Sequence, residues 1–179
     1  MLECHLGMLE TADGRPRRLG PADALTLARA WLVPVVADAP RAAPLLVAAV
    51  ADALDGIAAR ACAPTRAGKR FDGVVDGAIL VAALAAADRH RSLTRATIAL
   101  ELARLTAGAA YATCSYFASA KPPQPSLGRA ARAATPLRLA GLVCASLGRR
   151  RTGGRLVTLG RLVSLVLAEE AWRRERAAC

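Results

Sequence analysis

The sequence predicts an all-α fold, specifically a polytopic membrane protein with six transmembrane helices. Two observations support this class. Of the 179 residues, 54% are hydrophobic, and the mean hydropathy is +0.30, so the chain is more apolar than an ordinary soluble domain. The apolar residues are concentrated in six segments, which short basic loops separate. A membrane protein is therefore the first class to test.

Each apolar segment is interpreted as one helix. Several are shorter than the roughly 20 residues that span a bilayer, so flanking polar residues must extend them or snorkel to the interface. The abundant alanine and the 3% aromatic content leave a soluble alanine-rich bundle as the alternative. The six expected helices are Ala24 to Ala37, Ala42 to Ala59, Val74 to Ala87, Ala96 to Ala118, Ala133 to Leu147 and Leu156 to Ala168.

The first segment also has the pattern of a secretory signal, because basic residues 15–18 precede it and Ala37-Asp38-Ala39 follows it. We reject that interpretation because five further apolar segments come after it. The expected organisation is an N-terminal cytoplasmic segment (residues 1–20), a membrane domain (residues 21–171) and a basic C-terminal tail (residues 172–179).

The formal net charge of +11 suits nucleic acid, anionic lipid or phosphate-bearing substrates equally well. The region before the first helix, the second and fourth loops (with Arg138 counted in the fourth) and the region after the sixth helix together contain 14 lysines and arginines, against 8 in the other three loops. The positive-inside rule therefore predicts that both termini are cytoplasmic. Arginine and alanine predominate as in GC-rich bacterial genomes, so the expected location is the bacterial cytoplasmic membrane. The five cysteines lack a C-x-x-C pair, which supports neither a disulfide framework nor a zinc site.

Four carboxylates interrupt this apolar sequence. Asp52 and Asp55 lie three residues apart near the end of the second helix, and Asp72 and Asp76 lie four apart at the start of the third, so each pair shares a helix face. An ionised Asp at membrane depth costs about 2.5–3.5 kcal/mol, so the group needs cationic partners. Hard divalent ions such as Mg²⁺ or Mn²⁺ suit an all-carboxylate site. Pairing with the basic residues of the intervening loop, 60–70, is the alternative, and charge alone does not decide between them.

The full spacing is Asp52-x-x-Asp55-Gly56-x-x-Ala59-Arg60, seven residues, then Gly68-x-x-x-Asp72-x-x-x-Asp76. It resembles the signature of the CDP-alcohol phosphatidyltransferases at every fixed position, which is a specific signal. The stretch Leu25-Thr26-Leu27-Ala28-Arg29, with Pro34 after it, is similar to the first membrane helix of that family. The usual Pro-Asn pair before this helix is replaced by Pro21-Ala22-Asp23.

The resemblance implies a six-helix integral membrane enzyme, usually a homodimer. Such an enzyme transfers a phosphatidyl group from CDP-diacylglycerol to an alcohol and releases CMP. By resemblance, Asp52, Asp55, Asp72 and Asp76 hold two divalent ions, Mg²⁺ or Mn²⁺, and Asp76 is also the catalytic base. The residues implied to bind the donor nucleotide are Gly56, Ala59, Arg60, Gly68, Thr26 and Arg29.

The acceptor site is expected in the segment Ser126 to Thr135, which looks like a degenerate form of the family's Gly-Lys segment with Arg in place of Lys. Arg129 and Arg132 would bind an acceptor phosphate bidentately, which favours glycerol 3-phosphate. Two alternatives stay open. One is a catalytically inactive or scaffold member of the same fold. The other is a soluble basic helical protein that binds nucleic acid, which only the net charge supports, so nucleic acid is not an expected partner.

Overall fold

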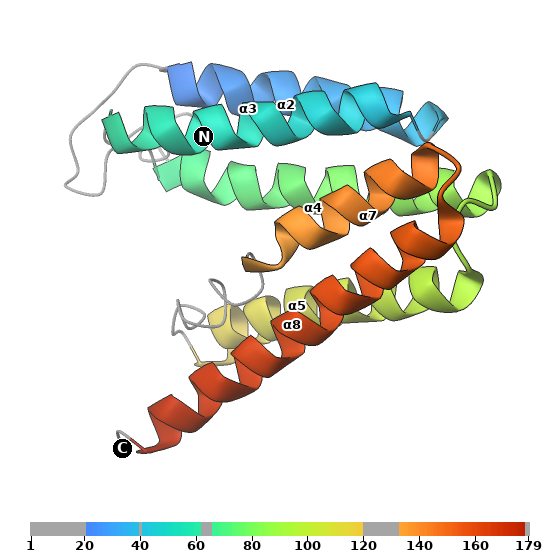
Figure 1. The fold of residues 1–179 in the computed structure, drawn as a ribbon. Helices are drawn as coiled ribbons and strands as arrows, with labels where there is room; N and C mark the ends of the chain where they lie inside the picture. The colour runs from blue at the N-terminus through green and yellow to red at the C-terminus, as the bar shows by residue number, and fades with distance from the viewer. Residues whose placement is uncertain (1–20, 40, 62–65, 120–132, 178–179) are drawn as a thin grey trace. The chain divides into compact units, whose positions relative to one another are not determined.

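The structure is a computed structural model and describes residues 21–39, 41–61, 66–119 and 133–177 (Figure 1). The described residues form an all-helical fold, which confirms the predicted all-α class. The chain divides into two compact units, residues 1–86 and 87–179. The helices are α2 (Pro21–Asp38), α3 (Ala42–Ala61), α4 (Arg66–Arg89), α5 (Arg95–Ser119), α7 (Thr135–Ser146) and α8 (Arg150–Ala177).

Within the described residues, no helix combines the length and the apolar composition needed to cross a membrane. The six predicted spans therefore stay a prediction.

Three of the expected helix boundaries are wrong. The third helix begins at Arg66 instead of Val74, and the sixth begins at Arg150 and ends at Ala177 instead of covering residues 156–168. The three added segments contain several arginines, which hydropathy assigns to loops although arginine is a good helix former. The residues expected to form a basic loop at 149–155 therefore lie, from Arg150 on, in the first turns of α8.

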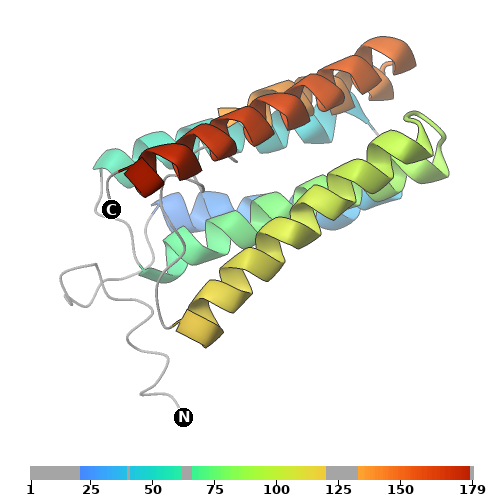
Figure 2. The ribbon, with the colours of Figure 1, turned by 90° about the horizontal axis from the view of Figure 1, so that it is seen from below.

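In the first unit, α2 and α3 run side by side, joined by a short connection (Figures 1 and 2). A small apolar core forms where Ala48 of α3 packs with Val75 and Ile79 of α4, against partly buried Leu32 and Val33 of α2.

The buried side of α2 changes character along its length. Thr26, Arg29 and Val36 are buried at intervals of three and seven residues, which places them on one face of the helix. The N-terminal part of this face is polar and the C-terminal part is apolar. The polar part of α2 faces the site described below.

In the second unit, α8 turns back along α7 (Figures 1 and 2). Gly148, with φ of +80°, makes the turn between them, a backbone conformation that glycine adopts without steric cost. The two helices touch at Gly141 and Gly153. A Cβ atom on Gly153 would lie 2.7 Å from the carbonyl oxygen of Gly141, and one on Gly141 would lie 2.7 Å from Cγ2 of Val157. Glycine is therefore required at this contact.

We predict that Gly153→Ala lowers the unfolding free energy by about 1–3 kcal/mol, because the added methyl group forces α7 and α8 apart. The matched control is Gly154→Ala in the same helical turn, where a Cβ atom would meet nothing within 4 Å. That control should be neutral or should gain about 0.5–1 kcal/mol, since alanine restricts the unfolded chain. Thermal unfolding of both variants measures the difference. Equal stability of the two variants would contradict the close contact.

Candidate metal centre

The four predicted carboxylates surround one buried guanidinium, that of Arg29 on α2. Its Nη1 lies 2.5 Å from Oδ1 of Asp72, 3.2 Å from Oδ1 of Asp52 and 3.7 Å from Oδ2 of Asp55. Its Nη2 forms an ion pair with Asp76. The arginine side chain is 1% exposed. Side chains from α2, α3 and α4 therefore meet at one guanidinium group. The four aspartates that the sequence singles out do lie together in the structure.

The helix periodicity explains this convergence. Asp52 and Asp55 are three residues apart on α3, and Asp72 and Asp76 are four apart on α4, so each pair projects from one helix face. Because α4 begins at Arg66, its two aspartates lie inside a continuous helix and not at its first residues. The helical backbone thus fixes the separation of each pair.

Asp55 differs from the other three carboxylates. It is buried, and the hydroxyl of Thr26 donates a hydrogen bond of 2.8 Å to its Oδ2. The side chains of Asp52, Asp72 and Asp76 are 50%, 31% and 34% exposed. Asp55 is therefore held against α2, while the other three keep oxygens accessible to a ligand.

The charges of this cluster do not balance. Burying a guanidinium is tolerable only when it is paired and hydrogen-bonded, and the carboxylates supply that pairing. Among the side chains that the structure describes, one guanidinium nevertheless faces four carboxyl groups. Within these residues the cationic groups are outnumbered, which favours the binding of further cations.

The donor set fits a divalent metal ion. One carboxylate oxygen from each of Asp52, Asp72 and Asp76 lies within 4.8 Å of the other two. Oxygen ligands of this kind suit Mg²⁺ or Mn²⁺ better than zinc, which prefers nitrogen and sulfur. Three of the four predicted ligands therefore form a group that could hold a metal. Asp55 lies outside that group because it bonds to Thr26, and its role as a ligand stays a prediction.

The other predicted site residues are placed only in part. Arg29, expected to face a phosphate, contacts the carboxylates, and its phosphate role stays a prediction. Of the remaining donor-site residues, Gly56, Ala59 and Arg60 lie in α3 and Gly68 lies in α4, where only the helical backbone is described. The predicted acceptor residues Arg129 and Arg132 lie outside the described residues.

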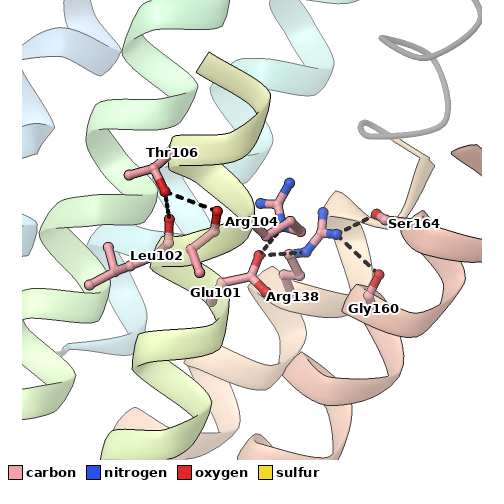
Figure 3. Close-up of polar contacts among 8 residues, drawn as sticks. Glu101, Leu102, Arg104, Thr106, Arg138, Gly160 and Ser164 are labelled. Carbon is pink, nitrogen blue, oxygen red and sulfur yellow. Dashed lines mark hydrogen bonds and ion pairs between the residues drawn. The ribbon is translucent and has the colours of Figure 1, made fainter. Parts of the chain in front are cut away.

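The second unit holds a buried charge cluster that the sequence analysis missed (Figure 3). Glu101 of α5 is fully buried, and its Oε1 lies 2.7 Å from Nε of Arg104 and 2.8 Å from Nε of Arg138 on α7. Arg138 also donates hydrogen bonds to the carbonyl oxygen of Gly160, at 3.1 Å, and to the hydroxyl of Ser164, both on α8. This network ties three helices together. The available signal was Glu101 itself, the one acidic residue within the apolar segment 96–118.

The fold and the first cluster define a class: an all-helical protein with a carboxylate group suited to divalent metal ions. The chain belongs to the CDP-alcohol phosphatidyltransferase family, which matches it over residues 20–168. This range includes α2 to α7, all four aspartates and the part of α8 up to residue 168. The family comprises transferases of phospholipid synthesis that use divalent metal ions. Comparison with curated proteins and with solved structures gave no match.

We predict that Arg29→Gln lowers the unfolding free energy by about 3–5 kcal/mol in EDTA, because the carboxylates lose their buried counter-charge. Added Mg²⁺ or Mn²⁺ should restore more stability to this variant than to the wild type. Arg41→Gln, at an exposed position between α2 and α3, makes the same charge change and should have little effect. Thermal melts with and without metal measure both quantities. An Arg29→Gln melt that resembles that of Arg41→Gln would show that the cluster contributes nothing to folding.

We predict that Glu101→Gln costs about 3–5 kcal/mol of unfolding free energy, because it leaves the buried Arg138 without its carboxylate. Glu169→Gln is the matched control. Its ion pair with Arg173 is exposed on α8, so its loss should cost at most about 1 kcal/mol. Chemical denaturation of both variants measures the difference, and equal costs would refute the structural role of Glu101.

Proposed function

We propose that this protein is an active enzyme that transfers the phosphatidyl group of CDP-diacylglycerol to an alcohol and releases CMP. The observation that carries the proposal is the gathering of Asp52, Asp72 and Asp76, with oxygens within 4.8 Å of one another, at the positions that match the family signature. Of the possible acceptors, we propose glycerol 3-phosphate.

The carboxylates have two tasks in this proposal. Asp52, Asp72 and Asp76, together with Asp55, would hold two divalent ions, Mg²⁺ or Mn²⁺. When bound, these ions neutralise the diphosphate of the donor and stabilise the charge that develops on the departing CMP. Thr26 keeps Asp55 in position through its hydroxyl group.

Asp76 is the proposed general base. Its carboxylate is one-third exposed and so remains accessible to an acceptor hydroxyl. As the hydroxyl oxygen forms a bond to the phosphorus, Asp76 accepts the hydroxyl proton, and the bond from phosphorus to the CMP oxygen breaks. Arg29 orients the Asp76 carboxylate through its ion pair, so Arg29 is a positioning residue for the base.

The proposal for the substrate-binding residues rests on the sequence. Gly56 and Gly68 lack a Cβ atom, which permits close approach of the cytidine nucleotide, with Ala59 and Arg60 beside it. Arg129 and Arg132 would clamp the phosphate of glycerol 3-phosphate, because guanidinium groups bind phosphate bidentately.

We further propose that the protein is a homodimeric integral membrane protein of the bacterial cytoplasmic membrane, with both termini in the cytoplasm. Large apolar side chains that are half or more exposed support an apolar environment, among them Trp31 on α2, Val47 and Val50 on α3 and Val166 on α8. The loop charges support the orientation.

The test is CMP release by the full chain in detergent, with Mg²⁺ or Mn²⁺, CDP-diacylglycerol and a panel of alcohols. Glycerol 3-phosphate should give the highest rate. Asp76→Asn should lower the rate about 100-fold or more, because the base is lost. Asp38→Asn, at the exposed end of α2, makes the same chemical change and should leave the rate unchanged.

Three results would contradict parts of the proposal. Full activity of Asp76→Asn would remove its role as base. No CMP release with any acceptor, from protein that melts cooperatively, would favour the inactive scaffold member of the family. Recovery of the protein in the supernatant after membranes are pelleted would contradict the membrane location.

A further inference from the structure

A groove in the second unit lies between the start of α5 and the first half of α8. Its volume is about 590 Å³. All of its lining residues belong to residues 87–179, so the groove is a feature of this unit alone. The lining combines three kinds of side chain: arginines (Arg150, Arg151 and Arg155), threonines (Thr94, Thr97 and Thr158) and leucines (Leu159 and Leu162), with Gly154 beside them.

The charged part of the groove is suited to an anion. Arg150, Arg151 and Arg155 are exposed, and no lining residue is acidic. The hydroxyl groups of Thr94 and Thr97 form a hydrogen bond of 2.9 Å to each other, which leaves one of the two O–H groups to donate to a ligand. Guanidinium and hydroxyl groups together are the usual donors to phosphate oxygens. The arginines are also in the first turns of α8, where the helix dipole adds positive potential.

The groove becomes apolar along α8. Arg151, Arg155, Leu159 and Leu162 follow one another at intervals of three or four residues and so share one face of the helix. Leu159 is 48% and Leu162 is 52% exposed. At 1.5 Å per residue, the stripe from Arg151 to Leu162 is about 16 Å long. That length is close to half the hydrocarbon thickness of a bilayer, about 15 Å.

We propose that this groove binds one anionic phospholipid, with its headgroup phosphate at Arg151 and Arg155 and an acyl chain along Leu159 and Leu162. A phospholipid has a phosphate at one end and a hydrocarbon chain at the other. The stripe on α8 has arginines at one end and leucines at the other, over a length that fits such a molecule. This site is distinct from the aspartate cluster, because the two share no residue. It would hold a lipid that the protein does not convert.

Other occupants fit the groove less well. A second copy of the chain, packed symmetrically on this face, would bring arginines together with no lining carboxylate to pair with them. A nucleic acid would find phosphate donors but no aromatic side chain among the lining residues for stacking. Free inorganic phosphate would leave the exposed leucines uncovered.

The experiment is a titration of the full chain in neutral detergent with phosphatidic acid, followed by native mass spectrometry. The wild type should bind phosphatidic acid in preference to phosphatidylcholine. The double variant Arg151→Gln/Arg155→Gln should bind it about tenfold more weakly, because two charge-assisted contacts to the phosphate are lost. Leu162→Ser should also weaken binding of phosphatidic acid, because the exposed leucine that would contact the acyl chain is lost.

The matched control is Arg173→Gln/Arg174→Gln, which removes the same charge from exposed residues of the same helix and should bind lipid as the wild type does. An equal loss of phosphatidic acid binding in both double variants would mean that only the net charge of the protein matters, and this would overturn the proposal. Displacement of the lipid by millimolar inorganic phosphate would identify free phosphate as the ligand, and displacement by an oligonucleotide would identify nucleic acid. A change from dimer to monomer in the Arg151→Gln/Arg155→Gln variant would make this face an interface between copies.

The Asp76→Asn variant separates this proposal from the proposed transferase activity. It should lose CMP release and keep phosphatidic acid binding, because the groove contains none of the aspartates. Loss of lipid binding in this variant would place the observed lipid at the aspartate cluster and refute the second site. Normal circular dichroism of the groove variants, whose substituted arginines are exposed, excludes misfolding as the cause of weaker binding.

Discussion

The burial of Arg29 is the constraint on which the first unit depends. A guanidinium that is 1% exposed needs carboxylates within hydrogen-bonding distance, and here α3 and α4 supply two each. The contacts specify which face α3 and α4 turn toward α2, and how far each is displaced along its axis. The apolar contacts among Ala48, Val75 and Ile79 are non-directional, whereas the ion pairs require a short distance between particular atoms. The site residues therefore also specify the packing.

The same arrangement would couple stability to the binding of a metal ion. A cation held by Asp52, Asp72 and Asp76 would share those carboxylates with Arg29, since Arg29 contacts all three. Arg29 supplies one of the positive charges that the cluster needs, and metal ions would supply the rest. Without an arginine, the four carboxylates would repel one another in the absence of metal, and this repulsion would lower the free energy of unfolding. A site fully neutralised by arginines would have no affinity for a cation. With one arginine among four aspartates, the cluster has a buried counter-charge for folding and still has carboxylates that favour a cation.

The sequence predicted that the four aspartates come together because the pattern that relates them is local. Asp52 and Asp55, like Asp72 and Asp76, are related by helical periodicity, and the spacing between the pairs is short. The boundaries of α4 and α8 were predicted poorly because hydropathy assigns their arginine-rich first turns to loops. The pairing of Glu101 with Arg138 could not be derived, because the partners are distant in the chain and no local pattern connects them. The contact between Gly141 and Gly153 could not be derived from the sequence either, because the two glycines lie on different helices and no local pattern connects them.

Solvent exposure distinguishes the roles of the two buried charge clusters. Glu101 and Arg138 are at most 3% exposed, and their contacts run to residues of neighbouring helices, so this network can serve packing but offers little access to a ligand. Asp52, Asp72 and Asp76 keep a third to a half of their side chains exposed although they surround a buried arginine. A purely structural cluster gains nothing from that exposure, because solvent weakens ion pairs. A cation and a substrate can reach the carboxylates only if these side chains are partly exposed. A binding site therefore needs partial exposure, whereas a cluster that only packs helices together does not.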